Sequence, residues 1–143
     1  MDVGKQELRE QEWKFPATPD SVRLARRDVD RAVQGWGWEP DSSGVDDLVV
    51  IVSELVTNAV LHASVPRRDV LVRLRQIEDR CRVEVVDGRP DLLPTTVLQP
   101  SKESGRGLLL VRKLSADMGV KRAGGDKIVW AEVHHQGRLE AAA

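Results

Sequence analysis

The chain of 143 residues carries a formal net charge of −1, with acidic and basic residues interspersed along it. This length predicts one domain with room for a hydrophobic core, and the balanced charge argues against a dedicated nucleic-acid binder, which would carry a basic face. Four Trp, one Phe and no Tyr make a base-stacking surface for single-stranded nucleic acid unexpected. The one cysteine, Cys81, excludes an intramolecular disulfide and a zinc site built from cysteines.

The sequence shows neither a targeting signal nor a membrane segment. The first residues lack an apolar signal region, and no apolar run is long enough to span a bilayer. We therefore expect a cytoplasmic protein without membrane contact. Residues 1–9 are expected to be disordered and residues 137–143 to form a flexible tail, so that one domain occupies residues 10–136.

The pattern of apolar residues, glycines, prolines and capping residues predicts alternating groups of strands and helices. In chain order these are a strand over residues 11–15, helices over 22–34 and 45–63, strands over 70–77 and 81–86, a helix over 108–116, and strands over 119–122 and 127–134. Residues 89–104 are rich in proline and predict a long loop, of the kind that often forms a lid. Because helices and antiparallel strands are segregated, we expect an α+β fold: a two-layer sandwich with helices on one face of a mixed, mostly antiparallel sheet.

The expected second helix carries a polar stripe within an apolar segment. Glu54, Asn58 and His62 are four residues apart, and each such step drifts by only about 40° around a helix, so the three side chains share one face. The opposite arc predicts a core-facing side and consists of Leu48, Val52, Leu55, Val56, Ala59 and Val60. A carboxylate, an amide oxygen and an imidazole in a row can hold a hard cation and activate a hydroxyl, although a solvated stripe on an amphipathic helix explains the same pattern.

Two further motifs follow the stripe. Asp87-Gly88 ends a predicted strand, an arrangement that is most often a simple turn. Gly105-Arg106-Gly107 precedes the expected third helix, where it either permits a tight helix entry or brings backbone N–H groups to a phosphate at the positive end of the helix dipole. It is not a Walker loop, since no Gly-Lys-Ser/Thr follows, and not a dinucleotide fingerprint, since no strand leads into it.

Together, the order and spacing of the three motifs resemble the GHKL superfamily of histidine-kinase-like ATPases, and most closely the anti-sigma-factor serine/threonine kinases and their stand-alone bacterial ATP-binding relatives. Residues 54–62 are similar to the family's Glu-x-x-x-Asn-Ala helix, residues 85–88 to its strand ending in Asp, and residues 105–108 to its Gly-x-Gly-Leu helix entry. The resemblance runs from the first strand to Val133 and implies the Bergerat-type version of the two-layer fold.

The resemblance also implies ATP and Mg²⁺ as ligands. Asn58 would give its amide oxygen to a Mg²⁺ ion that bridges the phosphates, and Glu54 would act as the catalytic base that orients the attacking hydroxyl. Asp87 would accept a hydrogen bond from the exocyclic amine of adenine. The resemblance implies further nucleotide-binding residues, namely His62, Gly88, Gly105, Arg106, Gly107 and Leu108.

The sequence departs from the family pattern in two places. Arg89 stands where the second motif usually has a glycine, and residues 127–130 offer no threonine of the kind that is common beside adenine. A glycine lets the backbone approach the ring closely, whereas Arg89 would crowd the ring or stack across its face. Both departures bear on nucleotide affinity and on kinase activity.

The expected function is that of an ATP-binding regulatory kinase, which holds a sigma factor and phosphorylates a serine on an antagonist protein. The alternative is a non-catalytic interaction module of the same fold with weak or lost ATP binding; the two departures favour it, and the Glu54–Asn58 pair opposes it. A sensor histidine kinase domain is a third reading, and it would need its phospho-accepting helices on a separate chain. The oligomeric state is left open between a monomer and a homodimer.

Overall fold

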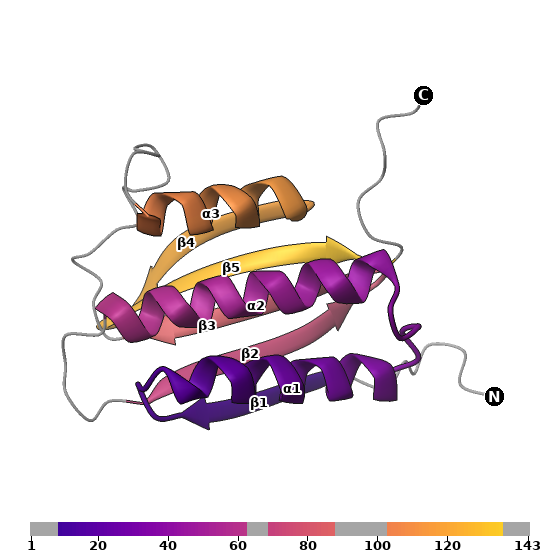
Figure 1. Ribbon diagram of the computed structural model, residues 1–143, viewed down its shortest axis with the longest axis horizontal. Helices are drawn as coiled ribbons and strands as arrows, with labels where there is room; N and C mark the ends of the chain where they lie inside the picture. The colour runs from indigo at the N-terminus through magenta and orange to yellow at the C-terminus, as the bar shows by residue number, and fades with distance from the viewer. Residues whose placement is uncertain (1–8, 63–68, 88–102, 136–143) are drawn as a thin grey trace.

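The computed structural model describes residues 9–62, 69–87 and 103–135 (Figure 1). The elements in these ranges are β1 (Glu10–Phe15), α1 (Asp20–Gly35), α2 (Ser43–His62), β2 (Val70–Ile77), β3 (Arg80–Asp87), α3 (Glu103–Leu114), β4 (Asp117–Ala123) and β5 (Asp126–His134). Their order is the predicted one, and every predicted boundary except the start of α3 lies within two residues of the observed one. No helix in the described ranges is long and apolar enough to cross a membrane.

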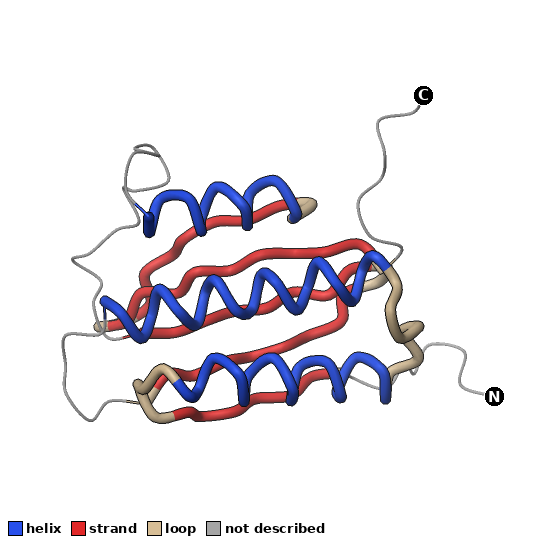
Figure 2. The backbone as a smooth tube through the Cα atoms, in the orientation of Figure 1, coloured by secondary structure: helices blue, strands red, loops and turns tan. Residues whose placement is uncertain are grey.

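The strands form one sheet in the order β1-β2-β3-β5-β4. Each neighbouring pair of the described strands is antiparallel, so the parallel pair that a mixed sheet would contain is not found among them. Figure 1 and Figure 2 show all three helices on the same face of the sheet, with α2 over its middle and α1 and α3 on either side. The predicted α+β fold, with two layers and helices on one face, is therefore confirmed.

The core lies between α2 and the sheet. The predicted apolar arc of α2 is buried there from Leu48 to Ala59, and only Val60 at its end is half-buried. On α1, buried Ala25, Val29 and Val33 follow the spacing of four residues that places side chains on one helix face. The strands contribute the inward half of their alternating side chains, as β2 does with Val70, Val72 and Leu74.

The start of α3 differs from the prediction. The helix begins at Glu103 rather than Leu108, so Gly105, Arg106 and Gly107 lie within its first two turns instead of ahead of it. Glycine at this place is compatible with a helix because the first N–H groups have no intrahelical partner, and an acidic residue at the N-terminus interacts favourably with the helix dipole. Of the predicted lid over residues 89–104, only residues 103 and 104 lie within the described ranges. Residues 1–8 and 137–143 lie outside them as well.

The other face of the sheet carries a network of ion pairs that joins β1, β2, β3, β4 and β5. Its closest contacts are Arg73 to Glu12 at 3.0 Å and Arg73 to Glu84 at 2.9 Å. Burial raises the pKa of the Glu84 carboxyl, but the hydrogen bond from Arg73 and the charges of Lys121, Arg82 and Arg73 outweigh this, so the pKa lies below its ordinary value. Arg82 also stacks on Trp130, with its guanidinium carbon 4.0 Å from the ring centroid.

Cys81 is a structural thiol rather than a reactive one. Its side chain is fully buried in the core on β3. Burial also raises the pKa of the thiol, so it stays protonated and is a poor nucleophile at neutral pH.

Gly44, near the start of α2, lies against the end of the sheet. A Cβ atom at this position would lie 2.5 Å from the backbone oxygen of His135 and 2.9 Å from that of His134. Because these are backbone atoms, α2 can begin this close to β5 only if residue 44 has no side chain. Gly35 at the end of α1 provides a contrast, since a Cβ there would meet nothing within 4 Å.

We predict that Gly44→Ala lowers the free energy of unfolding by about 1–3 kcal/mol, because the helix must move away from β5. Gly35→Ala, the matched control, should leave it unchanged or raise it by up to about 1 kcal/mol through the better helix propensity of alanine. Urea denaturation of the two variants measures both effects. Equal stability of the two variants would contradict the close approach at Gly44.

Candidate functional site

Three elements converge at one end of the sandwich. The C-terminal end of α2, the C-terminal end of β3 and the N-terminal end of α3 all lie toward the left of Figure 1. β5 begins at the same end, because its residue Lys127 is paired with Asp87. The positive end of the α3 dipole therefore points to the region where the three sequence motifs meet.

Glu54 and Asn58 are both half-buried on α2. They lie one helical turn apart on the same side, while their neighbours Leu55, Val56 and Ala59 are buried in the core. The third member of the predicted stripe, His62, is the last residue of α2, and its side chain lies outside the described part of the chain. The structure therefore places two of the three stripe residues side by side at the boundary of the core.

Gly107 brings α3 into direct contact with the stripe. A Cβ atom on Gly107 would lie 2.5 Å from Oε2 of Glu54, so the Glu54 carboxylate occupies the space that any other residue would fill. The next residue, Leu108, is buried and anchors α3 to the core. The first and third sequence motifs, which lie more than 40 residues apart in the chain, are thus joined at the Glu54–Gly107 contact.

Asn58 has a polar atom that lacks a partner within the described part of the chain. Its Nδ2 is buried, and among the described residues no group accepts a hydrogen bond from it. An unpaired buried polar group destabilises a fold by about 1–3 kcal/mol, and such groups in native proteins call for an explanation such as a bound ligand, ion or water. The amide of Asn58 therefore indicates that this end of the sandwich is completed by a group other than the described residues.

Asp87 is the last residue of β3, and its side chain lies outside the described part of the chain. Its cross-strand neighbour on β5 is Lys127, whose side chain is only 6% exposed. The sequence interpretation missed Lys127, because a lysine at the start of a strand normally points to solvent. The sequence does contain one signal for the burial of Lys127. It lies two residues before Val129, in the same alternation along β5 as the buried residues Ala131 and Val133.

The remaining predicted residues are placed only in part. Gly105 and Arg106 belong to the first turn of α3, but their surroundings lie outside the described part of the chain, as does Gly88. The described cluster thus combines a carboxylate, an amide with an unpaired atom, a glycine against the carboxylate and the start of a helix. Such a combination offers oxygen ligands to a hard cation and backbone N–H groups to an anion.

The Glu54–Gly107 contact predicts an energetic coupling between the two residues. In a Glu54→Ala background, Gly107→Ala should raise the free energy of unfolding by about 1 kcal/mol, the helix-propensity gain over glycine. In the wild-type background the gain should be smaller by about 0.5 kcal/mol or more, because the carboxylate must move aside. Urea denaturation of the four proteins of this double-mutant cycle gives the coupling energy, and a value of zero would contradict the contact.

Comparison with known proteins agrees with this geometry. The chain matches the model of the histidine kinase-like ATPase domain over residues 15–133. It is 32% identical over 128 residues to the serine-protein kinase RsbW of Bacillus velezensis, a match that covers 80% of this chain and 79% of that protein. The serine-protein kinase RsbW of Bacillus subtilis is 31% identical, with the same coverage.

A solved structure shows the same fold. It contains the RsbU and RsbW domains of a protein from Mycobacterium tuberculosis, and it matches 86% of this chain with a TM-score of 0.66 and 17% sequence identity. This chain covers 31% of that longer chain, so the likeness concerns the fold alone. The family model and the RsbW relatives, which cover most of the chain, show that it belongs to the GHKL superfamily of histidine kinase-like ATPases and, within it, to the anti-sigma-factor kinase family.

Proposed function

We propose that this protein binds Mg²⁺ and ATP at the end of the sandwich where α2, β3 and α3 converge, and that it transfers the γ-phosphate to a serine or threonine of another protein. The observation that carries the proposal is the contact between the Glu54 carboxylate and Gly107, one turn from the buried Nδ2 of Asn58, which has no partner among the described residues. The relatives named serine-protein kinase support the reaction class.

The residues present fit a magnesium nucleotide. Mg²⁺ in phosphoryl-transfer proteins is commonly held by one or two protein oxygens together with the substrate phosphates, and Asn58 offers such an oxygen. If its amide oxygen faced the ion, the Asn58 amide nitrogen would be free to donate to a phosphate or a water in the same site. Bound Mg²⁺ would neutralise the charge that develops on the transferred phosphoryl group.

Glu54 is the proposed base. Its carboxylate lies within one helical turn of Asn58, and it can accept a proton or a hydrogen bond from the hydroxyl that attacks the γ-phosphate. Gly107 keeps room for this carboxylate, while the first turn of α3, with Gly105 to Leu108, would offer backbone N–H groups to the phosphates. His62 and Arg106 are further candidates for phosphate contact.

Asp87 is the proposed adenine reader, together with Gly88 beside it. A carboxylate at the end of β3 would accept a hydrogen bond from the amine of adenine, whereas guanine presents a carbonyl oxygen there. Lys127 beside Asp87 introduces a buried cation into this half of the site. Lys127 lies in the strand where the family commonly has a threonine beside adenine. In this chain, adenine would therefore be recognised by Asp87 with Lys127 as its cross-strand neighbour.

The proposed partners are a sigma factor and an antagonist protein that carries the acceptor serine, as in partner switching, and the proposed place of action is the cytoplasm. The hydroxyl acceptor would come from a second protein. A non-catalytic interaction module of the same fold is the second candidate function. The buried Lys127 and the arginine at position 89 favour it, because both change the half of the site that would hold adenine.

Two substitutions on α2 should separate binding from transfer. Asn58→Ala should weaken Mg²⁺-dependent ATP binding about tenfold to a hundredfold, the loss of one interaction with a charged ligand. It should not lower the unfolding midpoint, because the Asn58 Nδ2 atom that it removes has no partner among the described residues. Glu54→Ala should retain ATP binding and lose phosphate transfer.

The measurements are calorimetric titration with ATP in the presence and absence of Mg²⁺, and labelling of candidate antagonist proteins with radiolabelled ATP. Thr57→Ala, a half-buried neighbour on α2 outside the stripe, is the matched control and should bind and transfer as the wild type does. ATP binding that is unchanged in Asn58→Ala would refute the magnesium role of Asn58. If wild type binds ATP but neither labels an antagonist nor hydrolyses ATP above background, the non-catalytic module is the better reading.

A further inference from the structure

Lys127 is a cation enclosed by the fold. Its side chain is only 6% exposed, and it alternates along β5 with Val129, Ala131 and Val133, which pack into the core. Lysine is almost never buried to this extent unless its ammonium group interacts with a polar partner. Lys127 does take part in an interaction within the chain. Because an ammonium group has three N–H donors, it can also donate a hydrogen bond to a ligand.

The position of Lys127 in the sheet brings it to the proposed nucleotide site. It is the second residue of β5, which begins at the end of the sandwich where α2, β3 and α3 converge (Figure 1). Its cross-strand neighbours are Asp87 on β3 and Arg122 on β4. Arg122 is exposed, whereas Lys127 is buried. Of these two cations, Lys127 is therefore the one that a ligand inside the fold would meet.

We propose that Lys127 donates a hydrogen bond to the N1 atom of adenine, beside the amine that Asp87 would recognise. This inference rests on the proposed function, because it assigns a role within the same nucleotide site. Adenine presents its amine, a donor, next to N1, an acceptor. A carboxylate and an ammonium group on neighbouring strands offer one acceptor and one donor, and so they complement these two groups of the base.

The burial of Lys127 favours N1 over N7, the acceptor on the other side of the amine. N7 belongs to the five-membered ring, which carries the ribose at N9 and therefore lies nearer to the triphosphate. N1 is the ring nitrogen farthest from N9, so it enters the fold more deeply than N7 when the phosphates lie at Asn58 and the start of α3. A cation that the fold encloses therefore meets N1 rather than N7.

Lys127 would also strengthen the discrimination against guanine. Guanine has a carbonyl oxygen in place of the amine and an N–H group in place of the N1 acceptor. A donor would then face the ammonium group of Lys127, and both would be left unpaired. A threonine hydroxyl, which the family commonly has in this strand, both donates and accepts, whereas an ammonium group only donates. We therefore infer that Lys127 is a specificity-determining residue of this site.

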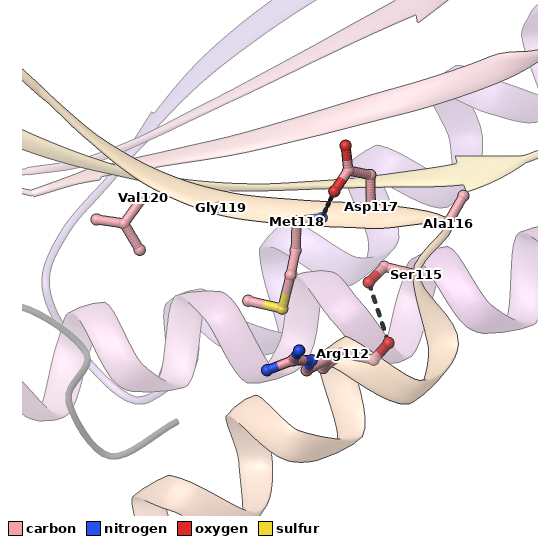
Figure 3. A pocket seen from close by; sticks show the side chains of 7 residues that line it. All are labelled: Arg112, Ser115, Ala116, Asp117, Met118, Gly119 and Val120. Carbon is pink, nitrogen blue, oxygen red and sulfur yellow. Dashed lines mark hydrogen bonds between the residues drawn. The ribbon is translucent and has the colours of Figure 1, made fainter. Parts of the chain in front are cut away.

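The hollow between α3 and β4 is less suited to a nucleotide. It has a volume of about 480 Å³, and Arg112, Ser115 and Met118 are among its lining residues. Figure 3 shows the Met118 side chain pointing into this space, while the Met118 N–H donates to Oδ1 of Asp117 at 2.9 Å. The hollow lies at the C-terminal end of α3, where the negative end of the helix dipole disfavours a triphosphate. The proposed site lies at the positive end of the same helix.

Two analogues of ATP test the contact with N1 on the wild-type protein. In 1-deaza-ATP a C–H group replaces N1, and in 7-deaza-ATP a C–H group replaces N7, while both analogues keep the amine. In calorimetric titrations with Mg²⁺, 1-deaza-ATP should bind about tenfold to a hundredfold more weakly than ATP, the loss of one hydrogen bond from a charged donor. The matched control, 7-deaza-ATP, should bind within about threefold of ATP.

Two substitutions assign this effect to a residue. Lys127→Met removes the ammonium group and keeps an unbranched side chain, so it should weaken ATP binding at least about tenfold and bind ATP and 1-deaza-ATP equally. Lys121→Met, the matched control, removes an exposed lysine that contacts Glu84 on the other face of the sheet, and it should keep the wild-type preference for ATP. Urea denaturation shows whether each variant unfolds cooperatively, and the comparison of analogues on the wild type needs no variant.

The possible results separate this inference from the proposed function. Equal binding of ATP and 1-deaza-ATP by the wild type would overturn the contact between Lys127 and N1, even if Lys127→Met weakened ATP binding by displacing Asp87. A wild-type preference for ATP that persists in folded Lys127→Met would also overturn it. Both results would leave the proposed function standing. Absence of ATP binding to the wild type would overturn the proposed function and this inference together.

Discussion

The contact between the carboxylate of Glu54 and Gly107 fixes how α3 lies against α2, and the candidate site depends on it. A side chain at position 107 would push the two helices apart or displace the carboxylate. With glycine there, Leu108 reaches the core and the N-terminal turn of α3 comes to the same end of the sandwich as Asn58 and Asp87. Motifs that are far apart in the chain thereby share one small region.

This arrangement places polar groups at positions where apolar side chains would stabilise the fold more. The Glu54 carboxylate and the Asn58 amide lie at the border of the core, and Nδ2 of Asn58 is buried without a partner among the described residues. A ligand that forms hydrogen bonds with these groups would remove the free-energy cost of leaving them unpaired. The stability of the empty protein and its affinity for the ligand are therefore linked. The ion pairs among Arg73, Arg82 and Glu84 lie on the other face of the sheet, away from this site.

The sequence was informative about the fold because its patterns are local. The spacing of Ala25, Val29 and Val33 and the alternation of β2 depend only on which residues face the core, so both could be predicted. The predicted start of α3 at Leu108 is wrong, because a Gly-x-Gly motif indicates a helix boundary, whereas the helix begins at Glu103 and its first turns contain both glycines. The alternation along β5 indicates that Lys127 faces inward, but whether a lysine at this position is buried depends on tertiary packing.

The proposed function depends on the binding of Mg²⁺ and ATP at the convergent end of the sandwich, with Asp87 reading the base. Calorimetric titration of the wild-type protein with ATP and with GTP, each with and without Mg²⁺, tests it most directly. We predict binding of ATP that requires Mg²⁺, and binding of GTP that is at least about tenfold weaker, because a guanine carbonyl facing the carboxylate would leave Asp87 unpaired. Equal affinities for the two nucleotides, or no detectable binding of ATP, would contradict it.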